Sequence, residues 1–246
     1  MSFFYHIVVV AIAAVMAITL HEAAHGYAAW ALGDDTARRM GRLSLNPLRH
    51  VDRFGTILLP GLMVFGQLIA LGRVVALFGW AKPVPVDVWK FRNPRRGMML
   101  VAAAGPAFNF FLAWLGAISL HAIPLVSHTL RAARMQLHFV EYFIVANMML
   151  GLFNLIPIPP LDGGRIAVGL LPEAPARAWA KLERAGIPLV LALLFLLPMA
   201  LGEFGIDADP MAEALTFAVL HGAHALFWLA GALPFLPHVL DDVFGA

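Results

Sequence analysis

The chain of 246 residues contains no cysteine, and only 13% of its residues are charged. Without cysteine the protein cannot form a disulfide framework, a thiolate metal site or a cysteine nucleophile. Any metal ion must therefore be held by His, Asp or Glu. Soluble globular chains carry charge on about a quarter of their residues, so the low charge argues against a water-soluble protein.

The hydrophobic share is instead high, at 61%, and includes 18 Phe and 6 Trp. Such a composition supplies several stretches of about 20 apolar residues, the length needed to cross the hydrocarbon core of a bilayer. The net charge is only +2, and the basic residues are better explained as topology signals than as a nucleic-acid site. We therefore expect an all-α polytopic membrane protein in contact with the lipid bilayer, and we expect no nucleic-acid partner.

The apolar pattern predicts about five to six transmembrane segments. A core over residues 1–165 contains three predicted spans, at residues 3–32, 97–123 and 139–156. The remainder, 166–246, reads as a cytoplasmic linker followed by two C-terminal transmembrane helices.

The stretch between the first two core helices is unusual. Residues 56–80 are apolar but contain the helix-disfavouring Pro60, Gly61, Gly66 and Gly72. We predict that this stretch is re-entrant or broken. A re-entrant segment or a short membrane-associated β region is expected between the first two core helices.

The basic residues are strongly clustered. Residues 38–53, 82–96 and 165–184 hold 14 of the 17 Lys and Arg. The positive-inside rule places all three segments in the cytoplasm, which requires 56–80 to enter and leave by the same face. The N-terminus then lies outside, and we expect the protein in the plasma or inner membrane.

A metal-binding pattern occurs inside the first span, as His21-Glu22-Ala-Ala-His25. Two His four residues apart share one face of a helix and can ligate one ion, while the adjacent Glu can act on a water molecule at that ion. With ten His in the chain, a chance match to this pattern is expected only about 0.01 times. Ionisable groups within a span are costly and by default mark function, and a shared metal satisfies all three.

A catalytic zinc site normally needs a third protein ligand. The acidic candidates are Asp34, Asp35, Asp52, Glu141 and Asp162. Asp162 is favoured because it follows an apolar span and a proline-rich turn, and because the next two residues are glycines that allow close backbone approach. Non-helical backbone at membrane depth is tolerated where it lines protein or a watery cavity.

These motifs together resemble the site-2 protease family, the M50 zinc intramembrane metalloproteases, and specifically its compact prokaryotic branch without PDZ or CBS domains. The matching segments are His21 to His25, Gly105-Pro-Ala-Phe-Asn109, Asn154-Leu-Ile-Pro-Ile-Pro-Pro-Leu-Asp162-Gly163, and Phe78 to Pro85. The resemblance extends from the N-terminus to about Arg165, and the last eighty residues match only as additional membrane helices.

The resemblance implies a role for each matched residue. His21, His25 and Asp162 would bind one catalytic Zn²⁺, and Glu22 would be the general base. Asn154 would lie near the metal and hold the substrate backbone or stabilise the oxyanion. Asn109 would support the same core, although an Asn in a membrane helix is more often an interhelical hydrogen bond.

The implied activity is intramembrane proteolysis, in which a zinc-activated water hydrolyses peptide bonds of transmembrane substrates near the cytoplasmic face. Expected partners are membrane-spanning protein substrates, such as a membrane-anchored regulator or a signal-peptide remnant. The basic segments around 38–60 and 82–96 would form the family's membrane-associated strand region, where an extended substrate pairs with an edge strand.

Two other classes fit parts of the pattern. A metal transporter or channel would use the same His and Asp as an ion pathway, but it predicts polar groups along several spans and often a repeat. An inactive family relative would act in binding or assembly, but it would not be expected to retain the complete set of His21, Glu22, His25 and Asp162.

Overall fold

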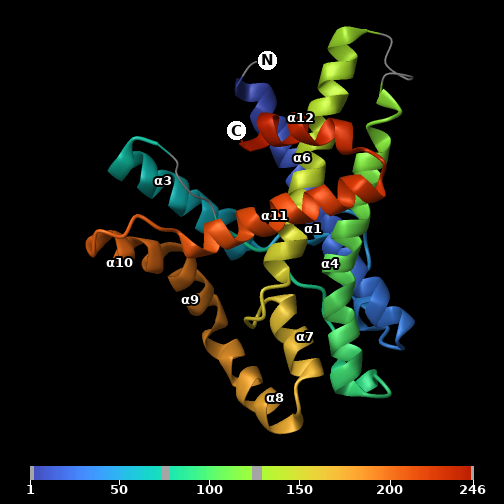
Figure 1. Ribbon diagram of the computed structural model, residues 1–246. Helices are drawn as coiled ribbons and strands as arrows, with labels where there is room; N and C mark the ends of the chain where they lie inside the picture. The colour runs from blue at the N-terminus through green and yellow to red at the C-terminus, as the bar shows by residue number, and fades with distance from the viewer. Residues whose placement is uncertain (1–2, 74–77, 124–128, 245–246) are drawn as a thin grey trace.

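The computed structural model describes residues 3–73, 78–123 and 129–244, which are helices joined by turns and short irregular segments (Figure 1). The longer helices are α1 (Phe3–Ala31), α3 (Leu59–Leu71), α4 (Pro94–Ser119), α6 (Leu130–Asn154), α7 (Asp162–Leu170), α8 (Glu173–Ala180), α11 (Pro210–Leu229) and α12 (Leu236–Phe244). The shorter pieces are α2 (Thr36–Arg39), α9 (Gly186–Leu191), α10 (Leu197–Glu203), and η1 to η6 (Pro47–Arg49, Arg53–Leu58, Val88–Lys90, Lys181–Ala185, Ala192–Leu196 and Leu233–Phe235).

Within the described ranges, six helical stretches are long and apolar enough to cross a membrane. They are Phe4–Ala31, Arg53–Ala70, Pro94–Ser119, Leu130–Asn154, Glu173–Glu203 and Pro210–Leu229. This number confirms the predicted all-α polytopic membrane protein. Large apolar side chains also face outward, such as Phe65, Ile69 and Phe217, each more than 60% exposed, as expected where lipid is the solvent.

Helices α1, α4 and α6 pack against one another and form the centre of the molecule (Figure 1). Their contacts use small residues, including the fully buried Ala13, Ala102 and Ala113. A Cβ at Gly116 of α4 would lie 2.7 Å from Ile144 of α6, so these two helices approach closely because this position is glycine. Small residues at helix contacts are typical of membrane proteins, where close backbone approach replaces the hydrophobic drive for association.

The core helices begin earlier than predicted. Helix α4 starts at Pro94 rather than 97, because the side chain of Asn93 accepts the N–H of Arg96 as an N-cap. Helix α6 starts at Leu130 rather than 139, with Thr129 as its cap. The semi-polar stretch 130–138 is therefore the first part of a long helix, and 124–128 lie outside the described residues.

The alternative of a β region between α1 and α4 is wrong for the described residues, which contain no strand there. Arg53–Leu58 forms a π-helical turn that continues into α3, and α3 ends at Gly72 in the left-handed conformation, with φ +67°. Residues 78–87 are neither helix nor strand. Pro83 and Pro85 have no N–H, so they cannot supply the regular hydrogen bonds of a strand.

The C-terminal part contains more helix than predicted. Helices α8, α9 and α10, with the short turns between them, form a nearly continuous run over Glu173–Glu203 that leads away from the core (Figure 1). Helix α11 packs across α4 and α6, and α12 packs on α6. A hydrophobic core lies here, where Phe227 of α11 is buried with Ile144 and Met148 of α6.

Candidate metal centre

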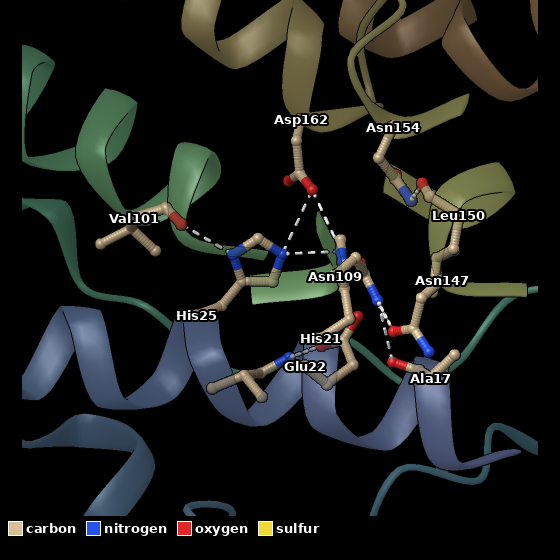
Figure 2. Close-up of polar contacts among 11 residues, drawn as sticks. Ala17, His21, Glu22, His25, Val101, Asn109, Asn147, Leu150, Asn154 and Asp162 are labelled. Atoms are coloured by element: carbon tan, nitrogen blue, oxygen red, sulfur yellow. Dashed lines mark hydrogen bonds and ion pairs between the residues drawn. The ribbon is translucent and has the colours of Figure 1, made fainter. Parts of the chain in front are cut away.

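Three side chains from two distant parts of the chain meet at one point (Figure 2). The Nε2 atoms of His21 and His25 lie 3.0 Å apart, and they lie 3.1 and 3.2 Å, respectively, from Oδ2 of Asp162. Their side chains are 6%, 11% and 9% exposed. Among the described residues, they are the one group of three metal-ligating side chains close enough to share an ion.

The other ring nitrogen of each histidine is engaged in a hydrogen bond. Nδ1 of His21 lies 2.5 Å from Oδ1 of Asn109, and Nδ1 of His25 lies 2.7 Å from the carbonyl oxygen of Val101. A carbonyl oxygen only accepts, so Nδ1 of His25 carries the proton. Its Nε2 lone pair then faces the cluster, as a metal ligand requires.

The donor set and its spacing fit zinc. Two imidazole nitrogens and a carboxylate are a known catalytic zinc set, with metal–ligand distances of about 2.0–2.2 Å. Ligands of a tetrahedral ion at those distances lie about 3.3 Å apart, close to the spacing of these three atoms. Oδ2 of Asp162 is buried and makes no hydrogen bond of good geometry to protein, so it is free to bind a metal ion.

Helix α4 reaches the cluster because it has a glycine there. A Cβ on Gly105 would lie 2.5 Å from the ring of His25 and 2.6 Å from that of His21. No side chain other than hydrogen fits against both imidazoles. The motif Gly105 to Asn109 thus brings one helix face into contact with both histidines.

Asp162 is positioned by a folded turn. Helix α6 ends at Asn154, and α7 begins at Asp162 itself. A Cβ on Gly163 would collide with the carbonyl oxygen of Leu155, so the turn folds tightly over the start of α7. The indole Nε1 of Trp179 donates to the carbonyl oxygen of Pro157 (2.9 Å) and braces the turn from α8.

The carboxylate of Glu22 is half-buried beside the cluster. Its Oε2 accepts a hydrogen bond from the backbone N–H of Val84, at 2.9 Å. Val84 lies between Pro83 and Pro85, so its N–H is the one backbone donor among these three residues. We call residues 82–87 the strap.

Buried charged side chains hold the strap in place. The guanidinium of Arg42, only 8% exposed, donates to the carbonyl oxygens of Lys82 (2.8 Å) and Pro83 (3.3 Å). At the other end of the strap, the fully buried carboxylate of Asp34 accepts the N–H of Asp87 at 2.7 Å. The strap is therefore fixed to the segment that follows α1.

Asp34 is ionised in this setting. Burial alone would raise the pKa of its carboxyl, but hydrogen bonds from Thr36 and from Asp87 N–H, with Lys90 Nζ at 3.3 Å, lower the pKa below its usual value. The structure thus gives Asp34 a structural role at the end of the strap, away from the histidines.

The other acidic candidates also lie elsewhere. Asp35 pairs with Lys90 at 2.8 Å, and Asp52 caps the turn at Arg53–Leu58. Glu141 is buried in α6, where His138 lies 3.6 Å away. Among these and Asp162, the structure brings only Asp162 to the two histidines.

The two asparagines differ in their surroundings. Asn109 is fully buried and contacts His21 directly. Asn154 is half-buried and donates to the carbonyl oxygen of Leu150 in its own helix, at 3.0 Å. Figure 2 shows it beside Leu150, on the same side of the site as Asn147.

Sequence reasoning missed two groups that the structure adds to the site. Asn147 is fully buried and accepts a hydrogen bond from Asn109 at 2.8 Å. It lies seven residues before Asn154, on the same face of α6, and an amide pair at this spacing in an apolar span was an available signal. The backbone N–H of Val84 carried no comparable signal, because a contact between distant segments leaves no periodic trace.

A buried His-Glu-x-x-His helix joined by an aspartate from a second segment is the site of a zinc metalloprotease. The family model "Peptidase family M50" matches residues 123–197, a stretch that contains Asp162. "Putative zinc metalloprotease YwhC" of Bacillus subtilis is 38% identical over 188 residues, covering 75% of this chain and 78% of that protein.

Two mycobacterial proteins are also similar. "Putative zinc metalloprotease Rip2" of Mycobacterium tuberculosis (strain H37Rv) is 34% identical, covering 77% of this chain and 67% of that protein. The protein of that name from Mycolicibacterium smegmatis is 32% identical, covering 73% of this chain and 63% of that protein. No solved structure matches the chain significantly.

The chain therefore belongs to peptidase family M50, the site-2 protease family, and to its compact members. It is a multi-pass membrane metallopeptidase, and zinc is its cofactor.

Proposed function

We propose that this protein is an intramembrane endopeptidase that hydrolyses transmembrane substrates near the cytoplasmic face of the membrane. The observation that carries the proposal is the meeting of His21, His25 and Asp162, because two of these residues lie in a helix that is long and apolar enough to cross a membrane. A hydrolytic site at this position acts on peptide bonds inside or next to the bilayer.

His21, His25 and Asp162 are the residues that would hold the zinc ion. The carboxylate contributes a negative charge that partly balances the ion in a low-dielectric setting. When bound, zinc supplies Lewis acidity that lowers the pKa of water and polarises a peptide carbonyl.

Glu22 moves the protons of the reaction. Its carboxylate takes a proton from the attacking water and returns it to the leaving amine. Because the Val84 N–H occupies Oε2, the other carboxylate oxygen is left for proton transfer. The strap thereby orients the base without consuming both of its acceptor oxygens.

Asn109 and Asn154 have different roles in this scheme. Asn109 supports the His21 imidazole from behind. The Asn154 amide would bind substrate backbone or the developing oxyanion. A carboxamide has two N–H donors, and the bond to Leu150 uses one of them.

Charge and depth together support a cytoplasmic active site. Glu22 lies nine residues before the end of α1 at Ala31, a rise of about 14 Å. The basic segments 38–53 and 82–96 come after that end of α1 in the sequence, and the second contains the strap. Basic segments face the cytoplasm. The N-terminus of α1 is then outside.

The substrates in this proposal are single-span proteins, such as a membrane-anchored regulator or a signal-peptide remnant. A transmembrane helix shields its peptide bonds with its own hydrogen bonds, so it must unwind locally before Glu22 and the metal can act on it. Helix-destabilising residues in a substrate are expected to speed cleavage.

Cleavage-site mapping tests the proposal. The purified protein is reconstituted in liposomes with a single-span substrate, and the products are mapped by mass spectrometry. A cut within the cytoplasmic half of the substrate span supports the proposal. A cut confined to soluble tails, or equal cleavage of a soluble peptide lacking the span, contradicts it.

A further inference from the structure

A continuous chain of hydrogen bonds links His21 to the backbone of α6, and Figure 2 shows its part from His21 to Asn147. His21 Nδ1 contacts Asn109 Oδ1 at 2.5 Å, and Asn109 Nδ2 donates to Asn147 Oδ1 at 2.8 Å. Asn147 Nδ2 in turn donates to the carbonyl oxygen of Phe143 at 2.8 Å. Asn109 and Asn147 are each 0% exposed, so water does not compete for these groups.

The direction of the chain is fixed at its far end. The carbonyl oxygen of Phe143 can only accept, so the NH₂ group of Asn147 must face it and its oxygen must face Asn109. Asn109 must then present its NH₂ group to Asn147 and its oxygen to His21. An oxygen at that place requires a proton on Nδ1 of His21, which leaves the Nε2 lone pair directed at Asp162 and His25.

The two histidines reach the same tautomer by different means. His25 donates directly to a backbone carbonyl, that of Val101, so no side chain is needed to fix its tautomer. His21 has a side-chain amide as its partner, and an amide can present either end. The choice between the two ends is made by Asn147.

We infer that Asn147 is a positioning residue for zinc binding, which sets the tautomer of His21 through Asn109. The inference rests on the proposed role of His21 as a ligand. Asn147 touches neither the metal-binding atoms nor Glu22, and it acts through one intermediate side chain from another helix. Its contribution is to hold the Nε2 lone pair of His21 in the orientation that the ion needs.

Without the Asn147 amide, Asn109 is no longer constrained to one orientation. Its remaining partner on the NH₂ side is the carbonyl oxygen of Ala17, at a longer 3.4 Å. The amide can then rotate and present NH₂ to His21 Nδ1, which favours the tautomer with the proton on Nε2. That tautomer cannot ligate zinc until it rearranges, so the apparent affinity falls.

The test compares zinc affinities of full-length variants in detergent, measured by competition with a chromophoric chelator. Asn147→Leu is expected to bind zinc about 10-fold more weakly, at the lower end of the range for residues that orient a ligand. The matched control is Gln67→Leu, which also removes an amide bonded to the carbonyl four residues earlier in its helix but lies in α3, outside the α1, α4 and α6 centre. Its zinc affinity is expected to be unchanged.

A double variant separates coupling from general damage. If Asn147 acts through Asn109, Asn109→Ala/Asn147→Leu binds zinc as weakly as Asn109→Ala alone. Asn147→Ala, which leaves a cavity instead of a new apolar contact, serves as the second variant if the leucine variant fails to fold. It is expected to give the same loss.

The tautomer itself is read from the imidazole ¹⁵N shifts of the histidine-labelled, metal-free protein. The His21 signals, assigned by their loss in His21→Ala, should show the Nδ1–H form in the wild type and a mixture in Asn147→Leu. Unchanged zinc affinity and unchanged shifts in Asn147→Leu would overturn the inference. If His21→Ala itself left zinc affinity unchanged, the ligand assignment in the proposed function would fail instead.

Discussion

The backbone N–H of Val84 donates to the carboxylate of Glu22 at 2.9 Å, which joins the strap to the proposed general base. The side chain of Val84 also lies against α1. Its Cγ1 is 3.3 Å from the position that a Cβ would take on Gly26. The strap and the base are therefore expected to act as one unit during catalysis.

Replacing Val84 by proline removes this one N–H. We expect Val84→Pro to lower kcat about 10-fold or more, because a hydrogen bond to a charged group contributes about 1.5–3 kcal/mol, and to leave KM nearly unchanged. Steady-state cleavage kinetics provide the measurement.

Two variants control for this change. Val84→Ala keeps the N–H and should retain most of kcat. Val86→Pro controls for the effect of an added proline as such, because it places one two residues further along the same strap. A rise in KM with kcat unchanged in Val84→Pro would show that the strap serves substrate binding and does not position the base.

Gly105 allows α4 to contact both histidines. Gly105→Ala places a methyl group 2.5 Å from the His25 ring, so we expect zinc affinity to fall more than 100-fold. The matched control is Gly66→Ala in α3, where nothing lies within 4 Å of the added methyl. Both changes favour the helix by up to about 1 kcal/mol, so the control accounts for helix propensity. Equal zinc affinities in the two variants would contradict the claim that a methyl group at residue 105 displaces the histidines.

The strap should loosen in acid through Asp34. The folded-state pKa of Asp34 is lowered, whereas an unfolded Asp titrates near about 3.9. Its stabilising contribution is therefore fully present above that value and is lost as the pH falls through the folded pKa. Thermal unfolding should show Asp34→Asn less stable than wild type at neutral pH, with the gap closing in strong acid. A gap that is independent of pH would contradict this role.

The absence of cysteine makes the proposed topology easy to measure. Trp89 lies just beyond the strap and is 83% exposed, and the chain contains no native cysteine. Trp89→Cys should react with a membrane-impermeant thiol reagent only from the cytoplasmic face. Labelling from the outer face would reverse the proposed orientation.

The sequence predicted the grouping of His21, His25 and Asp162 better than it predicted the contacts around these residues. The spacing of His21 and His25 is local, and the Asn154 to Gly163 motif is contiguous, so both could be recognised in one dimension. The strap contacts of Arg42 and Asp34 join segments about 40 to 50 residues apart, and no periodicity reports such pairing. The early start of α6 was missed because its first residues are semi-polar, although Thr129 provided a capping signal.

A β region was expected between the first two core helices, and the resemblance placed it in the segments around 38–60 and 82–96. Pro83 and Pro85 contradict regular strand pairing, and the structure has an irregular strap there that is held by side chains. Local chemistry was the better guide at this position than family likeness.

The most direct test of the central claim is the cleavage rate and zinc content of Glu22→Gln, measured on the same reconstituted preparation. The amide keeps the size of the side chain and an acceptor oxygen for Val84, but it cannot take a proton from water. We predict that zinc stays bound at the wild-type level while cleavage of a membrane-spanning substrate falls about 10²- to 10⁴-fold. Unchanged cleavage by zinc-loaded Glu22→Gln would contradict this prediction.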